Sequence, residues 1–201
     1  VTNVVSIRLT LNKLASLPSG VFNQNRKMTT LDLNSNDLTT IPPNLFDSTT
    51  SLAYLDMNAN KLTSVPNNLF SNCPSLLSLY LYSNKLKVAP DFAGNIKIDT
   101  IVLFNNDITL FPPNAIKFCQ KLTLLQLNGN KLTTIKEGWF ENANLRELLL
   151  NDNQIVSLDS WSFKNPALLK LDLRNNLLTS VPPRAFDLLT SLTALDLSEN
   201  K

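Results

Sequence analysis

A short hydrophobic pattern recurs along the whole chain: two apolar residues flank one variable residue, and an asparagine follows three positions later. Leu55 and Met57 before Asn60 are one example. The asparagines recur at a nearly constant spacing from one end of the chain to the other. Internal repeats of about 20–45 residues indicate a solenoid, in which each unit stacks on its neighbours. The repeat asparagines are Asn12, Asn36, Asn60, Asn84, Asn106, Asn130, Asn153, Asn176 and Asn200.

The two apolar residues of each unit predict a short β-strand, because side chains two positions apart in a strand point to the same side. One such strand per unit, stacked at about 4.8 Å, builds a parallel sheet along one wall of the solenoid. The apolar residues then fill the interior, and the residue between them faces outward. The asparagine can satisfy backbone groups where the chain turns out of the strand. We expect nine parallel strands and nine buried repeat asparagines.

The other wall is predicted from an apolar residue followed by proline and then by a phenylalanine, as in Ile41, Pro42 and Phe46. Proline resists long helices, so this wall should hold turns or 3₁₀ pieces and little α-helix. The unit with Lys85–Lys97 is two residues short, and we expect Phe92 to replace its missing ring. The side chains expected to stack as an interior spine are Phe22, Phe46, Phe70, Phe140, Phe163 and Phe186, with Ile116 in the fifth unit.

The pattern LxxLxLxxNxL resembles the leucine-rich repeat family, and closely its 24-residue typical class, found in extracellular receptors and proteoglycans. The resemblance covers essentially the whole chain. It implies an α/β-type solenoid shaped as a horseshoe, with short parallel strands on the concave wall and turns or 3₁₀ pieces on the convex wall. We interpret residues 1–201 as a single domain of eight full repeats and a truncated ninth. No terminal caps are recognisable, which indicates a fragment of a longer protein or a chain whose ends associate.

Composition argues against most enzymatic chemistry. The 201 residues contain no histidine, which excludes the serine triad, the cysteine–histidine pair and most catalytic zinc sites. Only four glycines occur, and no glycine-rich phosphate motif is present. The charge is balanced, with 18 basic and 16 acidic residues, so we expect no nucleic-acid partner. No apolar run is long enough for a spanning helix. We expect no enzyme activity, cofactor, metal or membrane insertion in this segment.

The two cysteines, Cys73 and Cys119, fall in the third and fifth units. Two strand spacings separate them, about 9–10 Å along the stack, which exceeds the reach of a disulfide. Both are therefore expected to be free thiols that act as small hydrophobes. The resemblance implies an extracellular or cell-surface location. None of the 27 asparagines belongs to an Asn-x-Ser/Thr glycosylation site, which argues mildly against that location.

The outward strand positions form the surface on which a solenoid binds a partner, and here they are unevenly filled. All three tyrosines fall on them, beside apolar residues of the third to seventh units. An exposed aromatic patch marks a contact site, and tyrosine is enriched at interfaces. The alternative is that the rings only stabilise the sheet through cross-strand contacts. The candidate ligand-binding residues are Tyr54, Tyr80, Tyr82, Val102, Phe104, Leu124, Gln126 and Leu149, and the candidate rim residues are Asp32, Asp56, Glu147, Lys170, Asp172, Arg174 and Asp196.

We therefore expect a recognition module that binds a protein or peptide on the concave face, as part of a secreted protein or receptor ectodomain. A glycan ligand suits the same residue types. One alternative is a structural or self-association module, which a concentration-dependent size in solution would reveal. A remote alternative is an enzyme that uses Asp32 and Asp56 as paired carboxylates, although no base or oxyanion device accompanies them. Trp139 and Trp161 are expected to pack in the back half of their units, and an exposed pair would be a second candidate patch.

Overall fold

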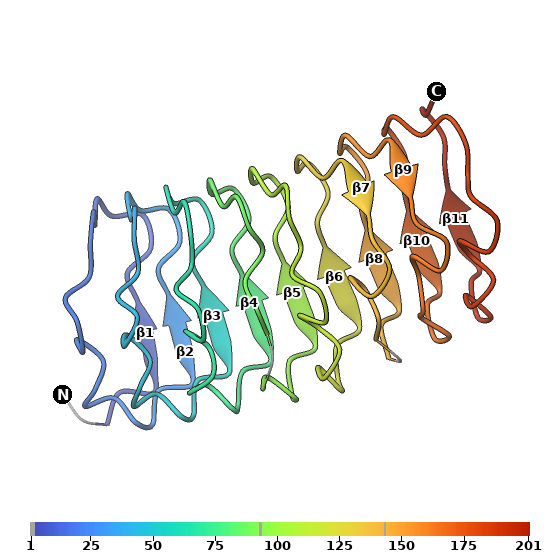
Figure 1. Ribbon diagram of the computed structural model, residues 1–201. Coiled ribbons are helices and arrows are strands. Elements are labelled where there is room, and N and C mark those ends of the chain that lie inside the picture. The colour runs from blue at the N-terminus through green and yellow to red at the C-terminus, as the bar shows by residue number, and fades with distance from the viewer. Residues whose placement is uncertain (1–2, 93, 143) are drawn as a thin grey trace.

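Nine short strands of the computed structural model form one parallel sheet along the length of the solenoid (Figure 1). The structure describes residues 3–92, 94–142 and 144–201. The order of the strands in the sheet follows the chain, which confirms the predicted nine-stranded wall. The strands are β1 (Ser6–Arg8), β2 (Thr30–Asp32), β3 (Tyr54–Asp56), β4 (Ser78–Tyr80), β5 (Thr100–Val102), β6 (Leu124–Gln126), β8 (Glu147–Leu149), β10 (Lys170–Asp172) and β11 (Ala194–Asp196).

Neighbouring strands pair in register, so that equivalent residues of successive units lie side by side. Leu31 of β2 is opposite Ile7 of β1 and Leu55 of β3. Leu31 and Leu55 are completely buried, whereas the residues on either side of them point out of the sheet. Burying one leucine side chain stabilises the fold by about 1.5–3 kcal/mol. The repetition of this burial from unit to unit supplies the core.

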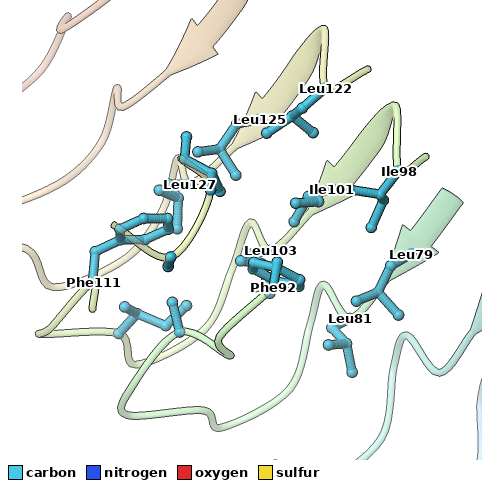
Figure 2. Packing of buried hydrophobic residues seen from close by; sticks show 14 of the residues in the cluster. Leu79, Leu81, Phe92, Ile98, Ile101, Leu103, Phe111, Leu122, Leu125 and Leu127 are labelled. Atoms are coloured by element: carbon cyan, nitrogen blue, oxygen red, sulfur yellow. The ribbon is translucent and has the colours of Figure 1, made fainter. Parts of the chain in front are cut away.

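The interior between the two walls is filled by side chains from both of them. Figure 2 shows Leu79, Ile101 and Leu125 pointing from their strands into the interior, which also holds the rings of Phe92 and Phe111. All five side chains are completely buried. Because these residues come from successive units, their packing joins each unit to the next.

The repeat asparagines join each unit to the one before it. The amide of Asn60 donates to the backbone carbonyls of Leu33 in the preceding unit and Met57 in its own unit. Its side-chain oxygen accepts a hydrogen bond from the backbone N–H of Leu38 at 3.0 Å. These bonds pair backbone groups that would otherwise be buried without partners. The buried repeat asparagines are Asn36, Asn60, Asn84, Asn106, Asn130, Asn153 and Asn176.

Asn12 and Asn200 correct the prediction that every repeat asparagine is buried. Asn12 is exposed, and its amide donates to the carbonyls of Leu9 and Thr10 in its own unit. Asn200 is half-buried, although it forms the same cross-unit bonds as the internal asparagines. Each of the two lies in an end unit of the stack, so a neighbouring unit covers it from one side only.

The back wall consists of turns, and no described residue is in a helix, so the predicted turns and low helix content are confirmed. The 3₁₀ pieces allowed by the sequence are absent from the described residues. Two features of this wall were not predicted. A second sheet pairs β7 (Thr134–Ile135) with β9 (Ser157–Leu158), and a single bridge joins Val88 to Leu110. These pairings form where extended segments of successive units run in parallel.

The predicted interior spine of phenylalanines is confirmed as ring stacking in two runs, one from Phe46 to Phe92 and one from Phe140 to Phe186. Phe46 and Phe70 stack with ring centroids 6.4 Å apart, and Phe140 and Phe163 do so at the same distance. Phe92 stacks on Phe70 at 6.3 Å. Phe92 therefore takes the place of the missing ring in the short fourth unit, as predicted.

Both cysteines are free and buried, as predicted. Burial raises the pKa of the Cys73 thiol to about 11 and that of the Cys119 thiol to about 12. A row of buried amides, which the sequence analysis missed, runs through the same part of the back wall. Asn95 donates to the carbonyls of Phe70 and Cys73, and Asn142 donates to the carbonyl of Cys119. Thiols and amides thus share one position of the repeat. The amides and the Cys119 thiol, which donates to the carbonyl of Phe92, pair backbone groups between units, whereas the Cys73 thiol contacts the hydroxyl of Thr49.

Candidate functional site

Two ring pairs lie on adjacent strands of the sheet, on its outward surface, which we call the sheet face. Tyr54 of β3 and Tyr80 of β4 have ring centroids 5.2 Å apart, with ring planes tilted by 41°. Tyr82 and Phe104, two residues beyond the ends of β4 and β5, stack at 4.4 Å with an interplanar angle of 13°. Aromatic pairs of this kind contribute about 0.5–1.5 kcal/mol beyond their burial. The rings therefore hold one another in place in the free protein.

The period of the strand puts these rings outside the core. Leu79 and Leu81 point inward and are completely buried, so Tyr80 between them and Tyr82 after them point outward. All four rings are half-buried. They keep part of their surface available to a partner while the other part packs on neighbouring side chains.

Two adjoining hollows open on this part of the sheet face. Tyr54 lines both of them, so its ring stands between the two. Their volumes are within the range of sites that receive ligand groups. The first, of about 490 Å³, is lined by Tyr54, Asp56, Tyr80, Tyr82, Thr100, Val102, Phe104, Leu124 and Gln126. The second, of about 650 Å³, is lined by Arg8, Thr10, Leu11, Thr30, Asp32, Asn34 and Tyr54.

Two carboxylates border these hollows, and each is fixed by the asparagine two residues later. One oxygen of Asp32 accepts hydrogen bonds from the backbone N–H and the side-chain amide of Asn34, at 3.1 and 2.7 Å. Asp56 accepts the same two bonds from Asn58, at 3.0 and 2.6 Å. The hydroxyl of Tyr54 donates to the other oxygen of Asp56 at 3.4 Å. The sequence analysis missed both asparagines, although the repeated spacing Asp-x-Asn places acid and amide on the same side of a strand.

Burial shifts the proton equilibria of this cluster. Burial raises the pKa of Asp56, although the hydrogen bonds from Asn58 oppose the shift. Burial and then the negative charge of Asp56 raise the pKa of Tyr54 to about 12. Burial also raises the pKa of Tyr82. Both tyrosines therefore keep their protons at physiological pH and offer neutral hydroxyl donors.

Two candidate residues are less exposed than their outward positions predict. Val102 is only 5% exposed, because it lies between Tyr80 of β4 and Gln126 of β6 in the register of the sheet. Asp56, expected on the rim, is 7% exposed and lines a hollow instead. Its burial follows from Tyr54, which bonds to it, and from Tyr80, its partner in register.

The other candidates for ligand contact lie further along the sheet. Leu124 and Gln126 of β6 are half-buried and line the first hollow. Leu149 of β8 is also half-buried, but it lies opposite Gln126 and lines neither hollow. The structure thus brings seven of the eight candidates together around one hollow and leaves Leu149 beside them.

The remaining rim candidates lie on β8 to β11, away from the hollows. Asp172 accepts a hydrogen bond from the backbone N–H of Arg174, whose guanidinium pairs with Glu199 at 3.4 Å. Hydrogen bonds from Ser198 lower the pKa of Asp196. These residues form a separate polar region, made of Glu147, Lys170, Asp172, Arg174 and Asp196.

The two tryptophans pack on the back half of their units, as predicted. Trp139 is 4% exposed and meets the ring of Phe140 edge-on. Trp161 is half-buried, and the guanidinium of Arg184 lies 5.5 Å from its ring centroid. With Trp139 buried, the two do not form an exposed pair.

Within residues 3–92, 94–142 and 144–201, no three histidine, cysteine, aspartate or glutamate side chains are grouped to hold a metal ion. The described part of the chain also has no helix long and apolar enough to cross a membrane. The groups that the sheet face does offer are aromatic rings, amides and carboxylates. Such groups bind ligands by ring contact, hydrogen bonds and charge.

The family model described as "Leucine rich repeat" matches residues 2–62, 50–108, 96–155 and 143–201. These overlapping matches cover nearly the whole chain. Comparison with curated proteins gives no match.

Solved structures share the fold. Drosophila Toll in complex with Spatzle is 27% identical with a TM-score of 0.88, over 100% of this chain and 29% of that one. TLR13 in complex with ssRNA13 is 27% identical with a TM-score of 0.82, over 92% of this chain and 27% of that one. The leucine-rich repeat domain of APL1B, at 22% identity, a TM-score of 0.84 and coverage of 98% and 57%, shows the fold alone. The chain thus spans between 27% and 57% of the length of these structures.

Proposed function

The chain belongs to the leucine-rich repeat family, and on this premise we propose that it is a recognition module whose sheet face binds a protein or peptide. We place the module in a secreted protein or in the extracellular part of a receptor. The observation that carries the proposal is the 490 Å³ hollow between two ring pairs, Tyr54 with Tyr80 and Tyr82 with Phe104.

The concentration of these rings supports binding over simple reinforcement of the sheet. Cross-strand aromatic contacts would stabilise any pair of strands, yet all four rings belong to the units of β3, β4 and β5. Half-buried tyrosines offer a large contact area with few torsions to fix on binding, and binding energy concentrates in such residues. A ligand seated there would cover the exposed half of each ring.

The similar structures support a macromolecular partner. Toll is described in complex with Spatzle, and TLR13 is described in complex with a single-stranded RNA. For this chain we favour a protein or peptide over RNA, because its net charge is only +2. Asp32 and Asp56 border the rings and would repel a phosphate backbone. We propose no reaction for these two carboxylates, because each is held by hydrogen bonds from the asparagine two residues later.

Selection of ligands from a phage-displayed library of random peptides tests the proposal, followed by titration of the selected peptides against purified variants. We expect Tyr82→Ala or Phe104→Ala to weaken binding by about 2 kcal/mol or more, as central interface aromatics do. Lys136→Ala, an exposed change on the back wall, should leave binding unchanged. Thermal unfolding of both ring variants should show only a small loss of stability, because their rings lie outside the core.

Equal binding by Tyr82→Ala and Lys136→Ala would show that the ligand does not use the rings. A molecular mass that rises with concentration in the wild type, but not in Tyr82→Ala, would identify a second copy of the chain as the ligand. Ring-dependent binding to a glycan array, without binding to peptides, would replace the peptide by a sugar.

A further inference from the structure

We propose that the ligand of the sheet face inserts a cationic side chain, an arginine or a lysine, between the carboxylates of Asp32 and Asp56 and the rings of Tyr54 and Tyr80. This inference rests on the proposed binding function and names the chemistry that the site selects. Because Tyr54 lines both hollows, one ligand side chain seated against its ring would reach both of them.

The two carboxylates are paired by the sheet. Asp32 of β2 lies directly opposite Asp56 of β3 in register, at a strand spacing of about 4.8 Å. Each uses one oxygen to accept two hydrogen bonds from the following asparagine, which fixes its orientation. Among the described residues, the second oxygen of Asp56 has only the long contact of 3.4 Å with the Tyr54 hydroxyl. Each carboxylate therefore keeps acceptor capacity for a donor that comes from outside the chain.

No ion pair within the described chain neutralises these two carboxylates. Arg8 of β1 lies opposite Asp32 in register, but it is exposed and forms no ion pair with either of them. A carboxylate as buried as Asp56, at 7% exposure, is costly without a counter-charge. A ligand cation would supply that charge at the place where the fold lacks it. Elsewhere in the described chain, ion pairs are formed by Asp37, Asp107, Glu137, Glu141 and Glu199.

The rings make the site suitable for an organic cation. Tyr54 and Tyr80 wall the hollow that contains Asp56, and their planes are tilted by 41°. A guanidinium or ammonium group that reaches the carboxylates would lie against these ring faces, where cations are attracted to the π-electrons. Arginine fits best, because its planar fork can donate to both carboxylates while it stacks on a ring. A neutral apolar group would instead leave the charge of Asp56 buried and unpaired.

The peptides selected from the phage-displayed random library test this inference directly. On the wild-type protein we expect the selected peptides to be enriched in arginine or lysine. The enrichment should disappear when the library is selected on the Asp32→Asn/Asp56→Asn variant, in which the amide oxygens can still accept the bonds from Asn34 and Asn58. A matched control, Asp47→Asn/Asp187→Asn, removes the same charge from exposed positions outside the sheet and should retain the enrichment.

A second measurement uses one selected peptide and its citrulline analogue, in which the arginine is replaced by a neutral side chain of the same shape. We expect the analogue to bind the wild type about tenfold more weakly or worse, and both peptides to bind the Asp32→Asn/Asp56→Asn variant equally. Peptides that depend on Tyr82 and Phe104 but show no enrichment in basic residues, or no loss with citrulline, would overturn this inference and leave the binding function intact. Recovery of no peptide, or of peptides indifferent to the ring variants, would contradict both.

Discussion

The ring of Phe92 lies parallel to the ring of Phe70, with centroids 6.3 Å apart and an interplanar angle of 6°. Phe70 stands ten residues after its repeat asparagine, whereas Phe92 stands eight residues after Asn84. The short fourth unit has lost two residues before its ring and still delivers that ring to the spine. The stacking of the rings, and not the number of residues in a unit, therefore determines how the back wall packs.

Replacing Phe92 tests the importance of this stacking. Phe92 is completely buried, so Phe92→Ala leaves a cavity next to Phe70 and should lower the free energy of unfolding by about 3–5 kcal/mol. Phe118→Ala, at a ring that is 59% exposed, is the matched control and should cost far less. Chemical denaturation of the two variants measures the difference, and similar midpoints would contradict a structural role for Phe92.

The asparagine row predicts a contrast between internal and end units. Asn130 donates to the carbonyls of Leu103 and Leu127 and accepts from the backbone N–H of Ile108, all in buried surroundings. Asn130→Ala leaves these groups unpaired and should cost roughly 3 kcal/mol of stability. Asn12→Ala, in the exposed position of the first unit, should cost less than about 1 kcal/mol. Equal losses in urea denaturation would show that the cross-unit bonds do not contribute.

The thiols give a prediction about reactivity and pH. Their folded-state pKa values, about 11 for Cys73 and about 12 for Cys119, exceed the ordinary value of 9.0. Neither thiol should therefore react with an aromatic disulfide reagent at about pH 8 in the folded protein, and both should react after denaturation without any reductant. Fewer than two reactive thiols in the denatured monomer would contradict their free state.

The same shifts have a consequence for stability. The folded state holds the thiol protons more tightly than the unfolded chain, so these protons add to the free energy of unfolding. This stabilisation is fully present below pH 9.0. It is lost as the pH rises through the folded values of about 11 and 12. The midpoint of thermal unfolding should fall over that range.

Asp56 is expected to reduce stability at neutral pH. Its folded pKa lies above the ordinary value of 3.8, so its favourable contribution is present below that pH and is lost as the pH rises through the folded value. Asp56→Asn keeps an acceptor for Asn58 and removes the buried charge, so it should raise the unfolding midpoint at neutral pH. The gain should shrink as the pH falls through the folded value and should be gone below about pH 3.8. Asp187→Asn, at an exposed position, should change little, and a destabilised Asp56→Asn would contradict the cost of the charge.

The repeat pattern predicts the direction of each strand side chain, because directions alternate along a strand. It places Leu55 inside and Asp56 outside, and the structure agrees on both directions. It does not predict how far neighbouring side chains cover an outward residue. Asp56 is buried because Tyr54 leans toward it on the same strand and Tyr80 lies beside it on the next. Such coverage depends on side-chain orientations that a one-dimensional pattern does not contain.

The missed amides of the back wall have a different cause. The reference is the sequence spacing from the repeat asparagine of the fifth unit to Cys119. The spacing from Asn130 to Asn142 is one residue shorter, and the spacing from Asn84 to Asn95 is two residues shorter. The units that contain these two amides are themselves shorter, by one residue and by two, so a count from the asparagine loses the equivalence. Alignment on the spine and on the strand together recovers it, because both are fixed by packing.

The in-register sheet also determines how the molecule would respond to tension. Its strands lie across the stack, so their hydrogen bonds run along it, and β1 and β11 lie at opposite ends of the stack (Figure 1). A force applied to both ends therefore acts on the hydrogen bonds of one strand pair at a time, and these bonds break in sequence. The outermost units, where Asn12 and Asn200 are least covered, should detach first. Single-molecule stretching should record a staircase of small extensions at low force, and one abrupt rupture of the whole chain would contradict it.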